Sequence, residues 1–133
     1  MVCLGDICDF GANALRSVLP IPVLGAGRAA MFHALTLGNS FSILTDAMRL
    51  HRMKKQVAEF GLSSYCAGIG TEDPAEADVQ IASGQGHPAI NPAPLSVSLV
   101  LGFLGLGLTH SARTYPAPET PKPELITTLA GAL

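Results

Sequence analysis

The sequence predicts an α/β fold, with a parallel sheet and flanking helices in a single domain. Three observations predict it. The chain has 133 residues, enough for one domain of ordinary size. Hydrophobic residues make up 48% and charged residues 14%, which excludes a disordered charged chain. Short apolar, strand-like runs alternate with helix-like segments, as in βαβ units.

The first 19 residues carry apolar side chains at near-helical spacing, which predicts a short helix in an N-terminal extension. Pro20 and Pro22 end it, because proline lacks an amide donor and restricts the residue before it. The main domain then runs over 20–112 and a proline-rich tail over 113–133.

Within the main domain, Val23-Leu24 is read as a strand that leads into a helix over 28–38. A second strand is expected at 41–45 and an amphipathic helix at 47–60. Residues 62–75 lack a clear pattern, and 87–94 contain three prolines, so no regular helix is expected there. Two further strands are predicted, at 77–82 and 95–101.

The strand-to-helix junction carries the chemical signal, a Gly-x-Gly-x-x-Ala motif. Gly25 allows a tight turn, Gly27 allows a pyrophosphate to approach the backbone, and Ala30 allows close helix packing. The following helix N-terminus, which begins at Arg28, offers free amides to phosphate. Asp46 lies where this fingerprint places an acidic residue for the ribose hydroxyls. An ordinary loop is the alternative explanation of the motif.

From Gly25 through Asp46 the chain resembles the first βαβ unit of NAD(P)-dependent dehydrogenases of the 6-phosphogluconate and β-hydroxyacid type, and of opine dehydrogenases. Residues 71–82 are similar to the segment that leads into a later strand of that family. The resemblance implies a Rossmann-like domain that binds NAD or NADP. It places Ser83 and His87 in a loop beside the nicotinamide.

The resemblance implies an oxidoreductase-type, dinucleotide-binding domain that lacks a substrate domain, as in a truncated member. It identifies no catalytic residue, and a homo-oligomer or a partner chain would supply the missing part. Asp46 favours NAD, whereas Arg49 and Arg52 leave NADP open, unless they form only a solvated helix face.

Other features narrow the function classes. The formal net charge of −2 argues against a nucleic-acid partner. The pattern of the three cysteines predicts free thiols in a reducing compartment. The N-terminal stretch is acidic, unlike a signal or transit peptide, so no targeting segment and a cytoplasmic location are expected. The four histidines show no metal-site spacing, and no metal is expected. Asp6 and Asp9, beside Cys8, match no known site pattern.

The alternative hypothesis is a small helical membrane protein with two transmembrane helices, acting as an accessory subunit. Residues 29–45 and 95–108 carry no Asp, Glu, Lys or Arg, and small residues recur along them. A span needs about 20 residues, however, and 95–108 is shorter. A chain without an evolved function is a third hypothesis that composition leaves open.

Overall fold

The computed structural model describes residues 2–4, 6–71 and 89–119. Strands and helices alternate along the chain up to residue 71, which confirms the predicted α/β class. In chain order, the elements are β1 (Val2–Leu4), α1 (Ala12–Val18), β2 (Val23–Gly25), α2 (Ala26–Leu37), β3 (Phe41–Thr45), α3 (Leu50–Glu59), β4 (Cys66–Thr71) and α4 (Pro92–Gly105).

The strands form two parallel pairs. β1 pairs with β2, with Val2 opposite Val23, and β3 pairs with β4, with Ile43 opposite Ile69. One helix connects the two strands of each pair, α1 in the first and α3 in the second, so each pair is a βαβ unit. The carboxyl ends of β1 and β2 therefore meet at one edge, where α2 begins directly after β2.

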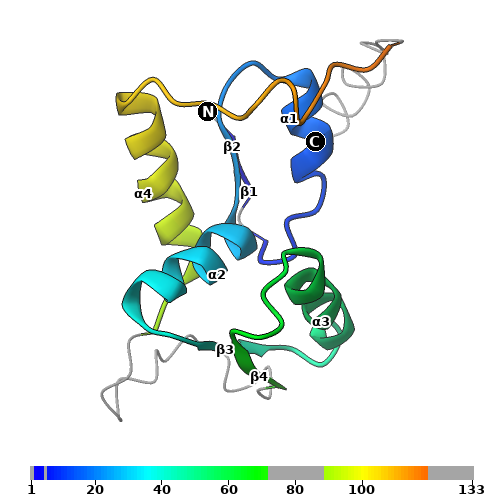
Figure 1. Ribbon diagram of the computed structural model, residues 1–133, viewed down its shortest axis with the longest axis vertical. Coiled ribbons are helices and arrows are strands. Elements are labelled where there is room, and N and C mark those ends of the chain that lie inside the picture. The colour runs from blue at the N-terminus through cyan, green and yellow to red at the C-terminus, as the bar shows by residue number, and fades with distance from the viewer. Residues whose placement is uncertain (1, 5, 72–88, 120–133) are drawn as a thin grey trace.

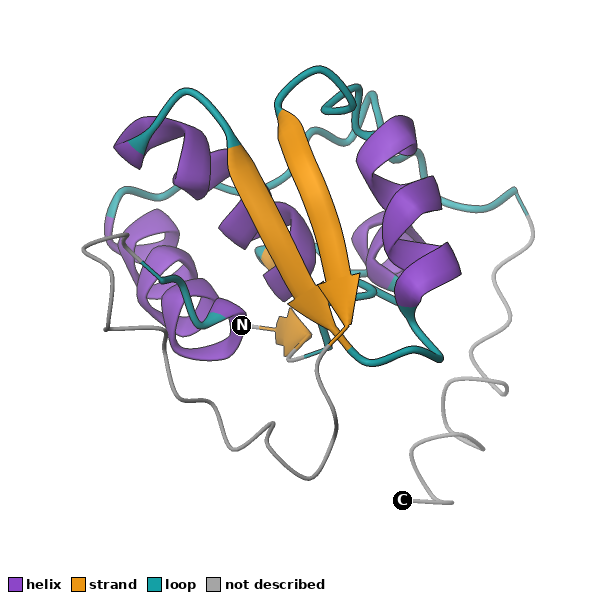
Figure 2. Cartoon of the chain, turned by 90° about the horizontal axis from the view of Figure 1, so that it is seen from below, coloured by secondary structure: helices purple, strands orange, loops and turns teal. Residues whose placement is uncertain are grey.

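Helix α2 lies between the two strand pairs (Figure 1). Helix α4 packs against α2 and β1, whereas α1 and α3 lie on the other side of the molecule. Figure 2 shows β3 and β4 side by side, with helices behind them. This arrangement brings the loop after β1, the start of α2 and one face of α3 together.

The main hydrophobic cluster lies between α2, α3 and the β3–β4 pair. Met53 and Val57 face it from α3, Ile43 from β3 and Met31 from α2. Cys8 joins this cluster from the loop after β1, with 1% of its surface exposed. The loop after β1 is thus anchored in the core rather than left on the surface.

Several predicted elements agree with the structure. The helix expected over 28–38 is α2, the strand expected over 41–45 is β3, and the helix expected over 47–60 contains α3. The first 19 residues differ in part, because the helix covers only Ala12–Val18 while Val2–Leu4 pairs as a strand. The strand β4 replaces part of a segment that showed no pattern, and the strand predicted at 77–82 lies outside the described residues.

The strand predicted over 95–101 is wrong, because this segment belongs to α4. The alternation of Ser and aliphatic residues suggested a half-buried strand, but the serine hydroxyls bond within the helix. The Ser96 hydroxyl donates to the Ala93 carbonyl at 2.8 Å, and the Ser98 hydroxyl donates to the Pro94 carbonyl at 3.1 Å. The expectation of no regular helix over 87–94 is wrong at its end, because α4 begins at Pro92. Proline is tolerated in the first helical turn, where no amide donor is needed.

The membrane alternative is wrong as well. Residues 29–45 do not form one helix, because α2 ends at Leu37 and β3 follows it. Helix α4 has 14 residues. Within residues 2–4, 6–71 and 89–119, none of the helices combines the length and the apolar character that a bilayer span requires.

Candidate functional site

The loop from Asp6 to Gly11 connects β1 to α1 at the carboxyl end of the first strand pair. In parallel α/β folds this edge is where ligands commonly bind. The loop turns sharply, since Asp9 has φ 52° and Gly11 has φ 77°, both left-handed conformations. Left-handed backbone at a non-glycine residue is strained and persists where surrounding contacts hold it.

Contacts from the Asp9 carboxylate to the start of α2 hold this loop in place. Its two oxygens accept hydrogen bonds from the backbone amides of Gly27, at 2.8 Å, and Arg28, at 2.7 Å. These amides have no partner within the helix, and the helix dipole favours a negative group there. Asp9 therefore takes the position that the sequence analysis assigned to a pyrophosphate.

The glycines of the motif are explained by the same contact. A Cβ atom on Gly25 would collide with the Asp9 carboxyl group, whose Oδ2 atom would be 2.7 Å away. A Cβ atom on Gly27 would collide with the Ile7 carbonyl oxygen and lie 2.8 Å from the Gln56 Nε2 atom. Close approach to the backbone requires glycine at both positions, but the approaching groups, a side chain at Gly25 and a backbone carbonyl at Gly27, belong to the chain itself.

Burial raises the pKa of Asp9 above its ordinary value of 3.8. The amide hydrogen bonds from Arg28 and Gly27, and the charges of Arg16 and Arg28, act in the opposite direction without overcoming burial. The folded chain therefore binds a proton at Asp9 more readily than the unfolded chain does.

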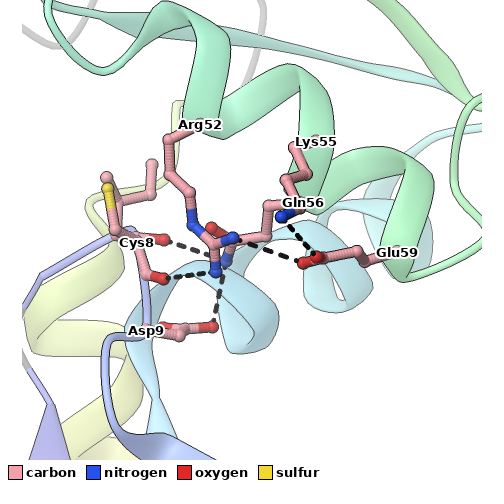
Figure 3. Close-up of polar contacts among 7 residues, drawn as sticks. Cys8, Asp9, Arg52, Lys55, Gln56 and Glu59 are labelled. Atoms are coloured by element: carbon pink, nitrogen blue, oxygen red, sulfur yellow. Dashed lines mark hydrogen bonds and ion pairs between the residues drawn. The ribbon is translucent and has the colours of Figure 1, made fainter.

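Helix α3 closes the loop from the other side (Figure 3). The buried Gln56 side chain donates from Nε2 to the Ile7 carbonyl at 3.0 Å and to Asp9 at 3.2 Å. Arg52 lies beside it and donates to the Cys8 carbonyl at 3.5 Å and to Glu59 at 3.5 Å. The Gln56 Oε1 atom is buried, and none of the residues that the structure describes donates a hydrogen bond to it. Side chains of α3 thus hold both the backbone and the carboxylate of the loop.

Cys8 and Asp6 form a second polar pair in the loop. The Cys8 amide donates to the Asp6 carboxylate at 2.8 Å, while Asp6 itself is exposed. Burial raises the pKa of the Cys8 thiol above 9.0, and the charge of Asp6 and a hydrogen bond to it raise this pKa further. The positive charges of Arg49 and Arg52 lower it by a smaller amount. Cys8 is therefore a protonated thiol that contacts an exposed carboxylate.

We expect Cys8 to resist alkylation in the folded chain, because its thiol is both buried and protonated. Iodoacetamide at mildly alkaline pH should modify Cys66, which is partly exposed, well before Cys8. Peptide mass mapping of the two sites gives the rates. Equal rates in the folded chain, with Cys8 no faster after addition of urea, would contradict the buried position.

The ionisation of Cys8 also predicts a pH dependence of stability. The folded-state pKa of Cys8 lies above 9.0. The contribution of the protonated thiol to the free energy of unfolding is therefore complete below pH 9.0 and is lost as the pH rises through the folded-state pKa. A Cys8→Ala variant should lose less stability than the parent chain over that rise, as measured by urea unfolding at several pH values.

The predicted cofactor residues have different positions in the structure. Gly25, Gly27, Arg28 and Ala30 lie together at the β2–α2 junction, as expected. Asp46 follows β3, and its carboxylate accepts from the Arg49 amide at 2.8 Å and forms an ion pair with the Arg49 side chain. Ser83 and His87 lie outside the described residues. A ligand-binding role for this set stays a prediction from the sequence.

Sequence reasoning missed the residues that organise the loop, which are Asp6, Cys8, Asp9 and Gln56. Gln56 is 49 residues from its partner Ile7, so no local pattern connects them. The available signal was the group of Asp6, Cys8, Asp9 and Gly11 directly after a short apolar run. Polar residues and glycine at the end of a parallel strand are typical of a site.

The sequence matches no protein-family model and no curated protein. Solved structures of two allantoin racemases are similar to this chain over 90% of its length. Allantoin racemase from Klebsiella pneumoniae matches with a TM-score of 0.76 at 21% identity, over 90% of this chain and 65% of its own. The crystal structure of allantoin racemase from Pseudomonas fluorescens matches with a TM-score of 0.73 at 22% identity, over 90% of this chain and 67% of its own.

These similarities overturn the predicted dehydrogenase identity. The chain has the fold of the allantoin racemases, so the resemblance to Rossmann dehydrogenases is wrong. The predictions of an NAD(P)-dependent oxidoreductase and of NAD or NADP as cofactor are wrong with it. The physical reason lies in the glycine motif, which the chain uses to accommodate its own Asp9 loop. The chain spans 65% of the length of the Klebsiella racemase.

Proposed function

We propose that this chain carries the proton-transfer site of a racemase that acts on allantoin or a similar ureide. The carboxylate of Asp6, exposed at the carboxyl end of β1 and in contact with the protonated Cys8 thiol, is the observation that carries the proposal. The fold shared with allantoin racemases supports the substrate class. A cytoplasmic location, and a second copy or partner chain that completes the enzyme, stay predictions.

Racemisation of allantoin requires a proton to leave the stereogenic carbon and to return to its opposite face. This carbon lies next to a ring carbonyl, so loss of the proton leaves an enolate. Asp6 would accept the proton as the base, because its carboxylate is exposed to a substrate. The Cys8 thiol, kept protonated by burial and by Asp6, would hold the carboxylate in place.

The charge around the loop suits this chemistry. The charges of Arg49 and Arg52 oppose the rise in the pKa of Cys8 without reversing it, so their positive potential reaches the loop. A positive potential there would stabilise the developing enolate relative to neutral substrate. Asp9 and Gln56 would keep the loop in one conformation, which reduces the reorganisation needed during the reaction.

The experiment measures exchange of the allantoin C–H with solvent deuterium. We expect the full chain in D₂O to remove this proton signal from the NMR spectrum, and polarimetry to follow any change in optical rotation. Asp6→Asn should slow exchange by about 100-fold or more, because it removes the base. Glu119→Gln is the control, since it makes the same charge change at an exposed position outside the loop.

Two results would contradict the proposal. One is wild-type exchange no faster than in buffer alone. The other is equal exchange in Asp6→Asn and in Glu119→Gln, which would remove the assigned role from Asp6. Exchange without change of optical rotation would support Asp6 as the base. It would also indicate that the group that returns a proton to the opposite face belongs to another chain.

A further inference from the structure

Two arginines from separate helices converge on one tyrosine hydroxyl. Arg16 of α1 and Arg28 of α2 each donate from Nη1 to the Tyr115 hydroxyl oxygen at 3.5 Å. The Arg16 guanidinium also lies over the Tyr115 ring, 5.2 Å from its centre. His110 contacts the same ring edge-on, at 6.0 Å between ring centres.

These two positive charges lack a carboxylate partner among residues 2–4, 6–71 and 89–119, where the ion pairs involve other arginines and a lysine. Asp9 is near enough for both arginines to oppose the rise in its pKa, but its oxygens are bonded to the amides of α2. Arg16 is 7% exposed, and a buried guanidinium normally has an anion beside it.

Neutral oxygens surround Arg16 in place of an anion: it donates to the Val23 carbonyl at 3.1 Å and to Asn13 Oδ1 at 3.0 Å, and more weakly to the Tyr115 hydroxyl. Hydrogen bonds from guanidinium to carboxylate are about 2.7–2.9 Å long and roughly twice as strong as those between neutral groups. Both contacts to the Tyr115 oxygen are longer, at 3.5 Å. A carboxylate at this point would receive hydrogen bonds from two guanidinium groups at once.

A cavity of about 330 Å³ opens beside the two arginines. Its lining includes apolar side chains, among them Val23 and Leu24 of β2, Phe103 of α4 and Leu108. The volume lies within the range of small-molecule sites. The cavity therefore combines a positive end with an apolar body, which suits an anion that carries a hydrocarbon group.

We propose that this cavity binds a small organic carboxylate. The carboxylate would take the place of the Tyr115 hydroxyl between Arg16 and Arg28, and its apolar part would lie between β2 and Phe103. None of the residues from Asp6 to Asp9 lines the cavity, so this site is distinct from the proposed proton-transfer site and does not depend on it.

Titration of the full chain with benzoate tests the proposal, with chloride added to keep the ionic strength constant. We expect saturable binding, seen in amide NMR shifts of β2 residues. Arg28→Gln should raise the dissociation constant about tenfold or more, since a charged hydrogen-bonding group is lost. Arg113→Gln, the same charge change at an exposed position outside the cavity lining, should leave it within about twofold.

Tyr115→Phe tests whether benzoate takes the place of the Tyr115 hydroxyl. Because the carboxylate replaces the hydroxyl, this variant should bind benzoate as tightly as the parent chain or more tightly. Absence of saturable shifts in the parent chain would overturn the proposal. Equal weakening in Arg28→Gln and Arg113→Gln would overturn it as well. Equal dissociation constants for inorganic phosphate and benzoate would show that charge alone binds the anion. The apolar lining would then have no part in the site.

Discussion

Replacing Gly27 with alanine should destabilise the fold by about 3 kcal/mol or more, which places it among the severe single substitutions. The new methyl group would collide with the Ile7 carbonyl oxygen and lie 2.8 Å from Gln56 Nε2. The oxygen is backbone, so relief requires movement of the whole loop from Asp6 to Asp9. Urea unfolding followed by circular dichroism measures the loss.

Gly102→Ala is the matched control for this substitution. Gly102 lies inside α4, and a Cβ atom there would meet no other atom within 4 Å. Alanine should therefore stabilise the chain by about 0.5–1 kcal/mol through its helix preference. A Gly27→Ala variant as stable as the parent chain would show that the loop does not lie against the start of α2.

Asp9→Ala is the second substitution with a large expected effect, a loss of about 2–4 kcal/mol. It removes the acceptor for the amides of Gly27 and Arg28 and for the Gln56 side chain. The Gly27 amide, which belongs to a buried residue, would then lose its acceptor, and an unpaired buried donor is costly. The Gln56 side chain would keep only the Ile7 carbonyl as acceptor. Chemical unfolding at a fixed pH gives the value.

The pH dependence of this effect has a definite sign. The folded-state pKa of Asp9 lies above 3.8, so the folded chain binds the proton more tightly than the unfolded chain. The contribution of Asp9 to the free energy of unfolding should therefore decrease as the pH rises from 3.8 through the folded-state value. Asp9→Asn, which cannot ionise, should remove this decrease. The same pH profile in Asp9→Asn and in the parent chain would contradict the assignment.

Local patterns predicted the elements between residues 23 and 60 well. The run of Ala, Leu and Met after the glycine motif, the β-branched run at 41–45 and the amphipathic pattern at 47–60 each carry their own signal. β1 has three residues and is held by pairing with β2 and packing against α4, so no local pattern predicts it. In α4 the serines alternate with aliphatic residues as in a half-buried strand. Their hydroxyls instead donate to carbonyls of the preceding helical turn, which the sequence does not reveal.

The candidate site was harder to predict, because its contacts join distant parts of the chain. Asp9 lies 18 residues before Gly27, and Gln56 lies 47 residues after Asp9. The motif itself was located correctly at a strand-to-helix junction, and the error concerned what approaches it. A glycine reports that something comes close to the backbone, but it does not report whether that is a ligand or another loop.

The carboxylate of Asp9 acts as a built-in counter-ion for helix α2. While the Asp9 carboxylate is bonded to the amides of Gly27 and Arg28, these amides cannot also bind a phosphate group. Phosphate binding there would require Asp9 to move away. Searches that assign nucleotide binding from Gly-x-Gly-x-x-Ala alone will therefore also select junctions of this kind, in which a side chain of the same protein binds the amides at the helix start. A useful filter is an acidic residue in the preceding βα loop, less than about 20 positions before the second glycine, whose side chain can reach the helix start first.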